Sequence, residues 1–318
     1  MSVPETPTKM HHELIAFPAR YSATGPVYGP GRVALQRGIR FPPFDAGGPG
    51  EWLRAVGGSW TLRNIQRLCM ADPATHCPVL VISMTNAEER RAAFAARAQG
   101  AEVAWRFFDA RTGLTEGLIY DAEAVERNKG RLLTKGELGC YASHFSIWQE
   151  MCHKQIAQCI VLEDDVIVDW AFLARLSETD LEAQNLRYLR LYSKAPTFNR
   201  VVSRNFLQRS RSIVELVGYP FGTQAYAITL NGARAFLEAC ATIKRPIDDQ
   251  MDRSWEHGVR NLALFPAPVI EEFVPSGIGS DRFATTGAEA YHTRRQRLAR
   301  WIDKARMHAK KLSVLRGN

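Results

Sequence analysis

The sequence predicts an α/β fold in which a mainly parallel sheet carries helices on both faces. From Pro78 onward, short apolar runs of strand length alternate with segments that have the spacing of amphipathic helices. The first of these runs, 79–83, is almost entirely apolar, as expected for a strand covered on both sides. A length of 318 residues with 46% hydrophobic content is also enough for a large core.

The predicted elements follow one another in a regular order. After the strand at 79–83, Asn86 is placed to cap a helix over 87–98, and a strand at 103–108 ends in Asp109. Farther along, the pattern predicts helices over 135–153 and 232–241 and strands at 156–162, 187–192, 213–217, 225–229 and 261–265. In open sheets of this kind ligands bind beyond the carboxyl ends of the strands, so residues that follow strands are the first site candidates.

The two ends of the chain differ from this central part. The first 77 residues contain nine of the 16 prolines, which favour turns, and they include one predicted amphipathic helix over 51–70. We therefore divide the chain into an N-terminal extension (1–77), an α/β domain (78–290) and a basic C-terminal helix (291–318).

The net charge of +8 belongs to the C-terminal segment. Residues 292–318 contain nine Lys or Arg and one Asp, which leaves 32 basic and 32 acidic residues in the rest of the chain. A protein that reads nucleic acid is expected to carry a basic face on its folded domain as well. The charge distribution therefore argues against nucleic acid as a partner.

Targeting and cysteine patterns indicate a cytosolic location. The sequence has no run of 18 apolar residues, and its first 30 residues lack the pattern of a secretory signal. The six cysteines are scattered and form no C-x-x-C pair, which favours reduced thiols over disulfides or a zinc site.

Three adjacent carboxylates, Glu163, Asp164 and Asp165, follow the predicted strand at 156–162. Crowded like charges raise one another's pKa, and a divalent cation removes that conflict. In an extended chain Glu163 and Asp165 share one side and Asp164 points to the other. Oxygen ligands of this type suit Mn²⁺ or Mg²⁺, and the alternative is a solvated acidic turn.

Several further motifs surround this cluster along the chain: Gly136–His144 (GELGCYASH), Trp148, Val161–Val166 (VLEDDV), Gly222-Thr223 with Tyr226, Asn231–Ala233 (NGA) and Arg245–Asp248 (RPID). In this order and spacing they resemble glycosyltransferase family 25, the lipooligosaccharide galactosyltransferase type. The similarity covers about 78–280.

The resemblance implies a GT-A type, Rossmann-like fold and a UDP-sugar donor, with galactose as the default sugar. It also implies inversion at the anomeric carbon, a metal held by Glu163 and Asp165, and a carbohydrate or glycolipid acceptor in bacterial lipopolysaccharide biosynthesis. The segment 246–252 (PIDDQMD) holds more carboxylates than the family pattern needs. The general base is therefore assigned to Asp248 first and Asp249 second.

Each candidate residue has an alternative structural role. Asp248 and Asp249 could instead charge the first turn of a helix, and His144 could be an ordinary core residue. Ser83, Asn86 and Asp109 could equally belong to a turn and a helix cap. The candidates for substrate binding are Ser83, Asn86, Asp109, Glu137, Ser143, His144, Asp164, Gly222 and Thr223, and those for catalysis are Asp165, Asp248 and Asp249.

The segment from Leu298 onward has an apolar stripe at helical spacing among many basic residues. Such a helix can lie on an anionic membrane, here the inner face of the cytoplasmic membrane, where it would meet a lipid-linked acceptor. The alternative is a terminal helix packed on the domain with a solvated charged face. A metal-dependent phosphohydrolase and a non-catalytic binding protein remain the competing functions.

Overall fold

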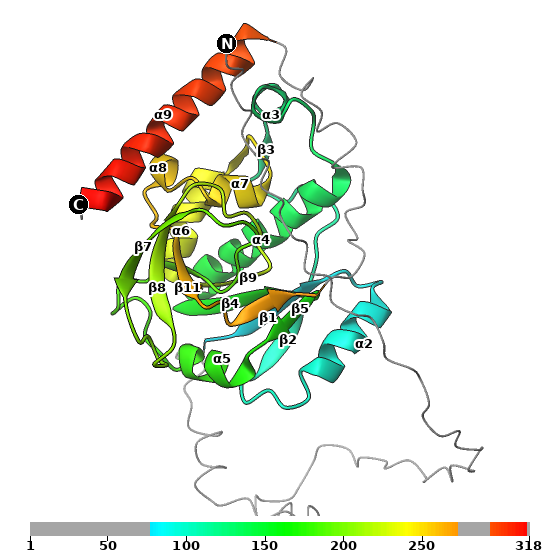
Figure 1. The fold of residues 1–318 in the computed structure, drawn as a ribbon. Helices are drawn as coiled ribbons and strands as arrows, with labels where there is room; N and C mark the ends of the chain where they lie inside the picture. Colours follow the sequence, from blue (N-terminus) through cyan, green and yellow to red (C-terminus); the bar gives the residue numbers. More distant parts are fainter. Residues whose placement is uncertain (1–76, 273–292, 317–318) are drawn as a thin grey trace, which may run out of the picture. The chain divides into compact units, whose positions relative to one another are not determined.

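The computed structural model describes residues 77–272 and 293–316, and the helix predicted over 51–70 lies outside these ranges. The main sheet has eight strands in the order β2-β1-β4-β9-β6-β11-β8-β7 (Figure 1). These strands are β1 Val79–Ser83, β2 Trp105–Asp109, β4 Gln158–Glu163, β6 Tyr188–Arg190, β7 Phe198–Ser203, β8 Ser212–Val217, β9 Ala225–Thr229 and β11 Leu262–Phe265.

Six of the eight strands run in the same direction, and β9 and β8 run against them. Because β9 and β8 each lie between two strands of the main direction, four of the seven pairings are antiparallel. The predicted α/β class is confirmed, and the strands are mainly co-directional. The mixed pairing was not predicted, since periodicity does not reveal which strands become neighbours.

Helices cover both faces of the sheet (Figure 1). On one face α2 (Glu88–Arg97) and α5 (Trp170–Ser177) pack against alternate residues of β1 and β4. On the other face α4 (Lys135–Lys154) and α6 (Leu230–Cys240) cover the intervening residues. The buried, almost continuously apolar strands of the sequence follow from this double cover.

The long elements match the sequence expectation to within a few residues, and the short ones were missed. Asn86 does not cap α2, because the N-cap residue is Ala87, and no side-chain cap bond is found there in the described chain. The missed elements include a sheet of β3 (Ile119–Tyr120) with β10 (Thr242–Ile243) and one of β5 (Val166–Val168) with β12 (Val269–Glu271). They also include the helices α3 (Ala122–Lys129) and α8 (Ser254–His257), whereas α7 (Ile247–Met251) is the helix expected as the alternative role of Asp248 and Asp249, which lie in its first turn.

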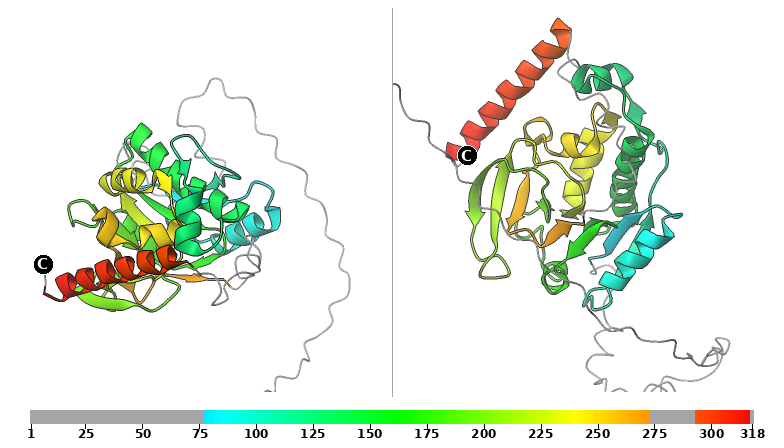
Figure 2. Two further views of the ribbon diagram at one scale, coloured as in Figure 1. Left: turned by 90° about the horizontal axis from the view of Figure 1, so that it is seen from above. Right: turned by 45° about the vertical axis from the view of Figure 1, so that its right-hand side comes forward.

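The predicted C-terminal helix is present as α9 (Arg294–Arg316), which lies against α3, α8, β7 and β8 (Figure 2). Met307 and Val314 are buried in this contact, and Asp303 binds Arg253, Tyr219 and Trp255. None of the described helices has the length and apolarity needed to cross a bilayer.

A buried ion pair joins the end of β6 to the segment after α7. Arg190 and Asp252 are almost completely buried and bind each other, and Asp252 also accepts from the Phe221 backbone N–H at 2.9 Å and from Asn261 at 3.3 Å. Arg190 donates to the backbone carbonyl of Gly222 at 2.6 Å. The pair therefore holds the 221–222 backbone in place.

We predict that Asp252→Ala lowers the free energy of unfolding by about 3–5 kcal/mol, because it leaves the Arg190 guanidinium buried without its partner. The matched control is Glu123→Ala, since the exposed Glu123–Arg127 pair spans 3.8 Å and Ala should change stability by less than about 0.5 kcal/mol. Urea denaturation followed by circular dichroism measures both. Equal, small changes in the two variants would contradict the role given to Arg190.

Candidate functional site

The acidic cluster lies at one edge of the main sheet. β1, β4 and β6 run in the same direction, so their carboxyl ends meet there, and β9 runs the other way and begins at the same edge. The loop before β9 therefore faces the turn after β4, and Glu163 accepts a hydrogen bond from the Thr223 hydroxyl at 2.6 Å. This is the edge at which sheets of this type bind ligands.

Glu163 is the last residue of β4, and its carboxylate faces α4 and the loop before β9. Its Oε1 lies 3.7 Å from Nε2 of His144. Burial works against ionisation, but the neighbouring His144, the Thr223 hydroxyl and Arg90 together hold the pKa of Glu163 below its usual value. The carboxylate is therefore held as an anion.

Asp164 and Asp165 form a turn rather than a continuation of the strand. Asp164 is directed toward β1, where it accepts from the Ser83 hydroxyl at 2.6 Å and binds the guanidinium of Arg90. Its backbone carbonyl accepts from Arg97 at 3.2 Å. The side chain of Asp164 is thus paired within the protein.

Asp165 has the least satisfied carboxylate of the three. Its Oδ2 lies 3.4 Å from Arg90, and its buried Oδ1 has no hydrogen-bond partner within residues 77–272 and 293–316. Burial and the charge of Glu163 raise the pKa of Asp165 to about 7. An orphaned oxygen beside a second carboxylate is a donor set that fits a hard divalent cation, with Glu163 and Asp165 as its ligands.

Gly222 and Thr223 connect this cluster to Asp248. The backbone N–H of Gly222 donates to Oδ2 of Asp248 at 3.4 Å, while the next residue, Thr223, binds Glu163. Gly222 has a φ of +83°, and a Cβ there would lie 2.4 Å from Oε1 of Gln224. The position therefore needs glycine.

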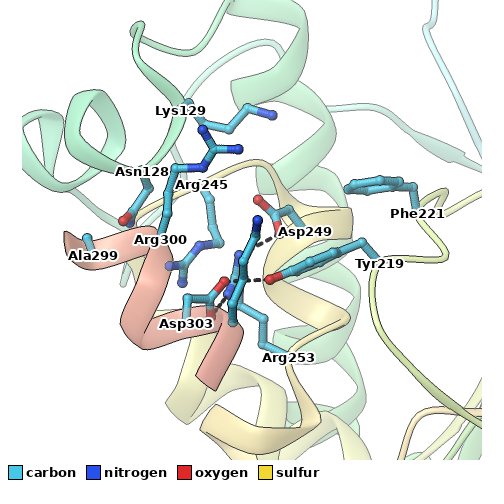
Figure 3. Close-up of a pocket in the computed structure, with 11 residues that line it drawn as sticks. Asn128, Lys129, Tyr219, Phe221, Arg245, Asp249, Arg253, Ala299, Arg300 and Asp303 are labelled. Atoms are coloured by element: carbon cyan, nitrogen blue, oxygen red, sulfur yellow. Dashed lines mark hydrogen bonds and ion pairs between the residues drawn. The ribbon is translucent and has the colours of Figure 1, made fainter. Parts of the chain in front are cut away.

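The three aspartates of 246–252 have different partners. Asp252 binds Arg190, and Asp249 binds Arg253 at 3.0 Å in a network that continues to Asp303 of α9 (Figure 3). Asp248 has only backbone N–H partners among the contacts found in the described chain. Burial and the charge of Asp249 raise its pKa above the usual value, which favours proton acceptance.

His144 lies on α4, and its side chain is buried. Its Nδ1 lies 2.9 Å from the Tyr226 hydroxyl, which also accepts from Trp148 at 3.2 Å. Its Nε2 has no hydrogen-bond partner in the part of the chain that the structure describes. The ring is thus held at one nitrogen, and the other faces Glu163.

Three of the other candidates, Glu137, Ser143 and Asp109, have structural contacts outside the three-carboxylate cluster. Glu137 forms the capping box of α4 with Thr134 and binds Arg131 through both oxygens at 2.8 Å. Ser143 bonds to the backbone of Gly139 and Arg111, and Asp109 binds Arg91 with its side chain largely exposed. Asn86 is exposed.

Sequence reasoning missed four side chains at this edge, Arg90, Tyr192, Gln224 and Glu271. Glu271 of β12 accepts from the Tyr192 hydroxyl at 2.7 Å and from Lys194 at 3.0 Å, and its charge raises the pKa of Asp165. Arg90 lies near the start of the helix after β1, a position that could have been a signal. Glu271 carries no such signal, because the β5–β12 pairing brings it there.

The fold and this edge define an α/β protein with an acidic site beyond the carboxyl ends of its strands. The model of Glycosyltransferase family 25 (LPS biosynthesis protein) matches residues 76–251, more than half of the chain. The chain therefore belongs to glycosyltransferase family 25, as the sequence resemblance predicted.

Two curated relatives illustrate the similarity. Inactive glycosyltransferase 25 family member 3 of Homo sapiens is 32% identical over 188 residues, which cover 54% of this chain and 30% of that protein. Procollagen galactosyltransferase 1 of Danio rerio is 33% identical over 123 residues, covering 38% of this chain and 20% of that protein. The chain thus spans less than a third of the length of these relatives.

Among solved structures, a glycosyltransferase involved in the glycosylation of the major capsid of PBCV-1 is 14% identical, with a TM-score of 0.26. The match covers 51% of this chain and 65% of that one. This similarity is too low to bear on the fold or the function.

Proposed function

We propose that this chain is an inverting, metal-dependent glycosyltransferase that moves a hexose, galactose by default, from a UDP-sugar to a carbohydrate or glycolipid acceptor. The observation that carries the proposal is the Gly222-Thr223 link, which joins the acidic cluster to Asp248. Thr223 binds Glu163, a proposed ligand of the metal ion that would neutralise the donor diphosphate. Gly222 binds Asp248, whose raised pKa suits it to accept the proton of the acceptor hydroxyl.

The departing diphosphate gains negative charge in the transfer. Mn²⁺ or Mg²⁺, bound by Glu163 and Asp165, would supply Lewis-acid stabilisation of that charge. Arg90, which touches both Asp164 and Asp165, adds a fixed positive charge to the same edge. Asp164 thus has a supporting role, in which it positions Arg90.

The attacking hydroxyl must lose a proton, and Asp248 is the proposed acceptor of that proton. In the described chain its oxygens meet only backbone N–H groups, whereas Asp249 and Asp252 each bind an arginine. A carboxylate paired with Arg is a poorer base, because the cation stabilises its ionised form.

We propose that the acceptor binds near α9. A pocket of about 210 Å³ lies between α9 and the domain, and its lining includes Lys129, Phe221, Asp249 and Asp303 (Figure 3). Lys129 lies close enough to Asp248 for its positive charge to lower the pKa of that carboxyl, against the larger effects of burial and Asp249. An acceptor in this pocket would contact Asp249, the second candidate for the base, which is adjacent in sequence to Asp248.

The same helix supports binding to an anionic membrane on the cytoplasmic face. Leu298, Trp301 and Leu312 are exposed, and their helical spacing places them on the side opposite to Met307 and Val314. α9 therefore packs on the domain through one face and presents an apolar stripe with flanking basic residues on the other. Packing on the domain and binding to a membrane, the two roles predicted for this segment, are therefore compatible.

A non-catalytic protein is the second candidate, because several relatives at 30–32% identity are named inactive. We favour a catalytic function because Glu163, Asp165 and Asp248 lie at the same edge of the sheet and are linked through Gly222 and Thr223. A phosphohydrolase would use the same metal ligands, and its mark would be UDP-sugar hydrolysis without an acceptor.

A donor screen tests the class. We expect one UDP-sugar to raise the melting temperature of the full chain in the presence of Mn²⁺ and to release UDP with an acceptor. Asp165→Asn should remove both effects, because it removes a metal ligand, and Glu123→Gln, an exposed carboxylate, should leave them unchanged. No response to any nucleotide sugar would favour the non-catalytic alternative.

The general base is tested by Asp248→Asn. Transfer should fall by ~10²- to 10⁴-fold while stabilisation by the donor is kept, because the amide cannot take the proton. Asp249→Asn should keep more of the transfer and lower the melting temperature, since Arg253 loses a partner. Nearly normal turnover in Asp248→Asn would move the role to Asp249 or His144.

Membrane binding is tested by cosedimentation with anionic and neutral vesicles. The full chain should bind anionic vesicles in a salt-sensitive manner, and Trp301→Glu should weaken binding without unfolding, because Trp301 is 68% exposed. Unchanged binding after truncation at Tyr291 would contradict the assignment to α9.

A further inference from the structure

We propose that Cys140, His144 and Glu163 form a zinc-binding site beside the oxygen-ligand site. The three residues offer one sulfur, one nitrogen and one oxygen atom that all lie within 4.8 Å of one another. Cys140 and His144 are four residues apart on α4, so they share one face of that helix, and Glu163 meets them from the end of β4. Its test does not depend on the proposed transfer reaction, although Glu163 is also a proposed ligand of Mn²⁺ or Mg²⁺ there, so the two ions would share this carboxylate.

The spacing fits a tetrahedral ion. Zinc binds Cys sulfur at about 2.3 Å, His nitrogen at about 2.0–2.1 Å and carboxylate oxygen at about 2.0–2.2 Å, so its ligands lie roughly 3.4 to 3.6 Å apart. The distance from Nε2 of His144 to Oε1 of Glu163 is 3.7 Å. All three ligand atoms lie within 4.8 Å of one another, so side-chain movements of up to roughly 1 Å would enclose the ion.

The unpartnered nitrogen of His144 is the observation that points to a ligand. The side chain is fully buried, and its Nε2 lacks a hydrogen bond from any described residue. A buried polar atom without a partner is costly, and a metal ion would satisfy it. Without a metal, an Nε2–H facing the Glu163 carboxylate at 3.7 Å accounts for the lowered pKa of Glu163. With a metal bound, Nδ1–H would donate to the Tyr226 hydroxyl at 2.9 Å and the Nε2 lone pair would face the ion.

The surrounding groups orient the ligands as in known zinc sites. Tyr226, itself fixed by Trp148, holds the imidazole, and the Thr223 hydroxyl at 2.6 Å holds the carboxylate of Glu163. Thr223 also lies 3.9 Å from the sulfur of Cys140, so it borders the fourth position. Three protein ligands and one further position are the pattern of an open zinc site.

The ligand chemistry separates this site from that of Mn²⁺ or Mg²⁺. Thiolate and imidazole ligands select zinc, whereas Mn²⁺ and Mg²⁺ prefer the oxygens of Glu163 and Asp165. Burial, followed by the negative charges of Glu163 and Asp248, raises the pKa of the Cys140 thiol well above its usual value. The same negative charges attract a cation, which would displace the thiol proton.

Metal content and cobalt spectroscopy test the site. The full chain, stripped with a chelator and reloaded with Zn²⁺ alone, should hold one tightly bound zinc by elemental analysis. Loading with Co²⁺ alone should produce the thiolate-to-cobalt charge-transfer absorption in the near ultraviolet. Tyr226→Phe should weaken zinc binding by ~10- to 100-fold while keeping that absorption, because the ligands remain and their support is lost.

Cys140→Ser should remove the absorption and weaken zinc binding by more than ~100-fold, as expected when a ligand itself is lost. Cys152→Ser, on the same helix but far from Glu163, is the matched control and should retain both properties. The proposal is overturned if the unsubstituted chain binds no stoichiometric zinc, shows no thiolate band with cobalt, or loses the band in Cys152→Ser. The spectrum of the unsubstituted chain decides the question even if Cys140→Ser does not fold.

Discussion

The architecture of the site depends on the buried ion pair between Arg190 and Asp252. A guanidinium removed from water must have its charge and its N–H groups satisfied, and here Asp252, Asn261 and the carbonyl of Gly222 do so. These bonds fix the loop before β9. Thr223 can then reach Glu163, and the N–H of Gly222 can reach Asp248.

The acidic cluster is stable because its members have separate partners. Glu163 faces Thr223 and His144, Asp164 is neutralised by Arg90, and only Asp165 keeps a buried oxygen without a partner among the residues described. Asp165 is therefore the carboxylate of the cluster that the described residues satisfy least. The same separation among Asp248, Asp249 and Asp252 leaves one carboxylate outside any arginine pair.

Much of the fold could be predicted because β1, β4, α4 and α6 carry strong apolar periodicity. The short elements could not, since β5 and β12 become strands only by pairing with each other over a long sequence separation. For the same reason the position of Glu271 at the site could not be predicted, whereas Glu163 directly follows a predicted strand. Candidates chosen only for following a strand, such as Asn86 and Asp109, lie outside the cluster.

By itself the sequence determined the α/β class, the membership in glycosyltransferase family 25 and the position of the acidic cluster at a strand end. Local patterns determine these properties, because periodicity and motif order lie within short stretches of chain. Only the tertiary structure decided the partner of each carboxylate and brought Cys140 and His144 beside Glu163. The cysteine spacing in the sequence argues against a zinc site because it contains no compact ligand motif. The proposed ligands come from a helix and a strand that are separate in the sequence, so local spacing does not reveal them.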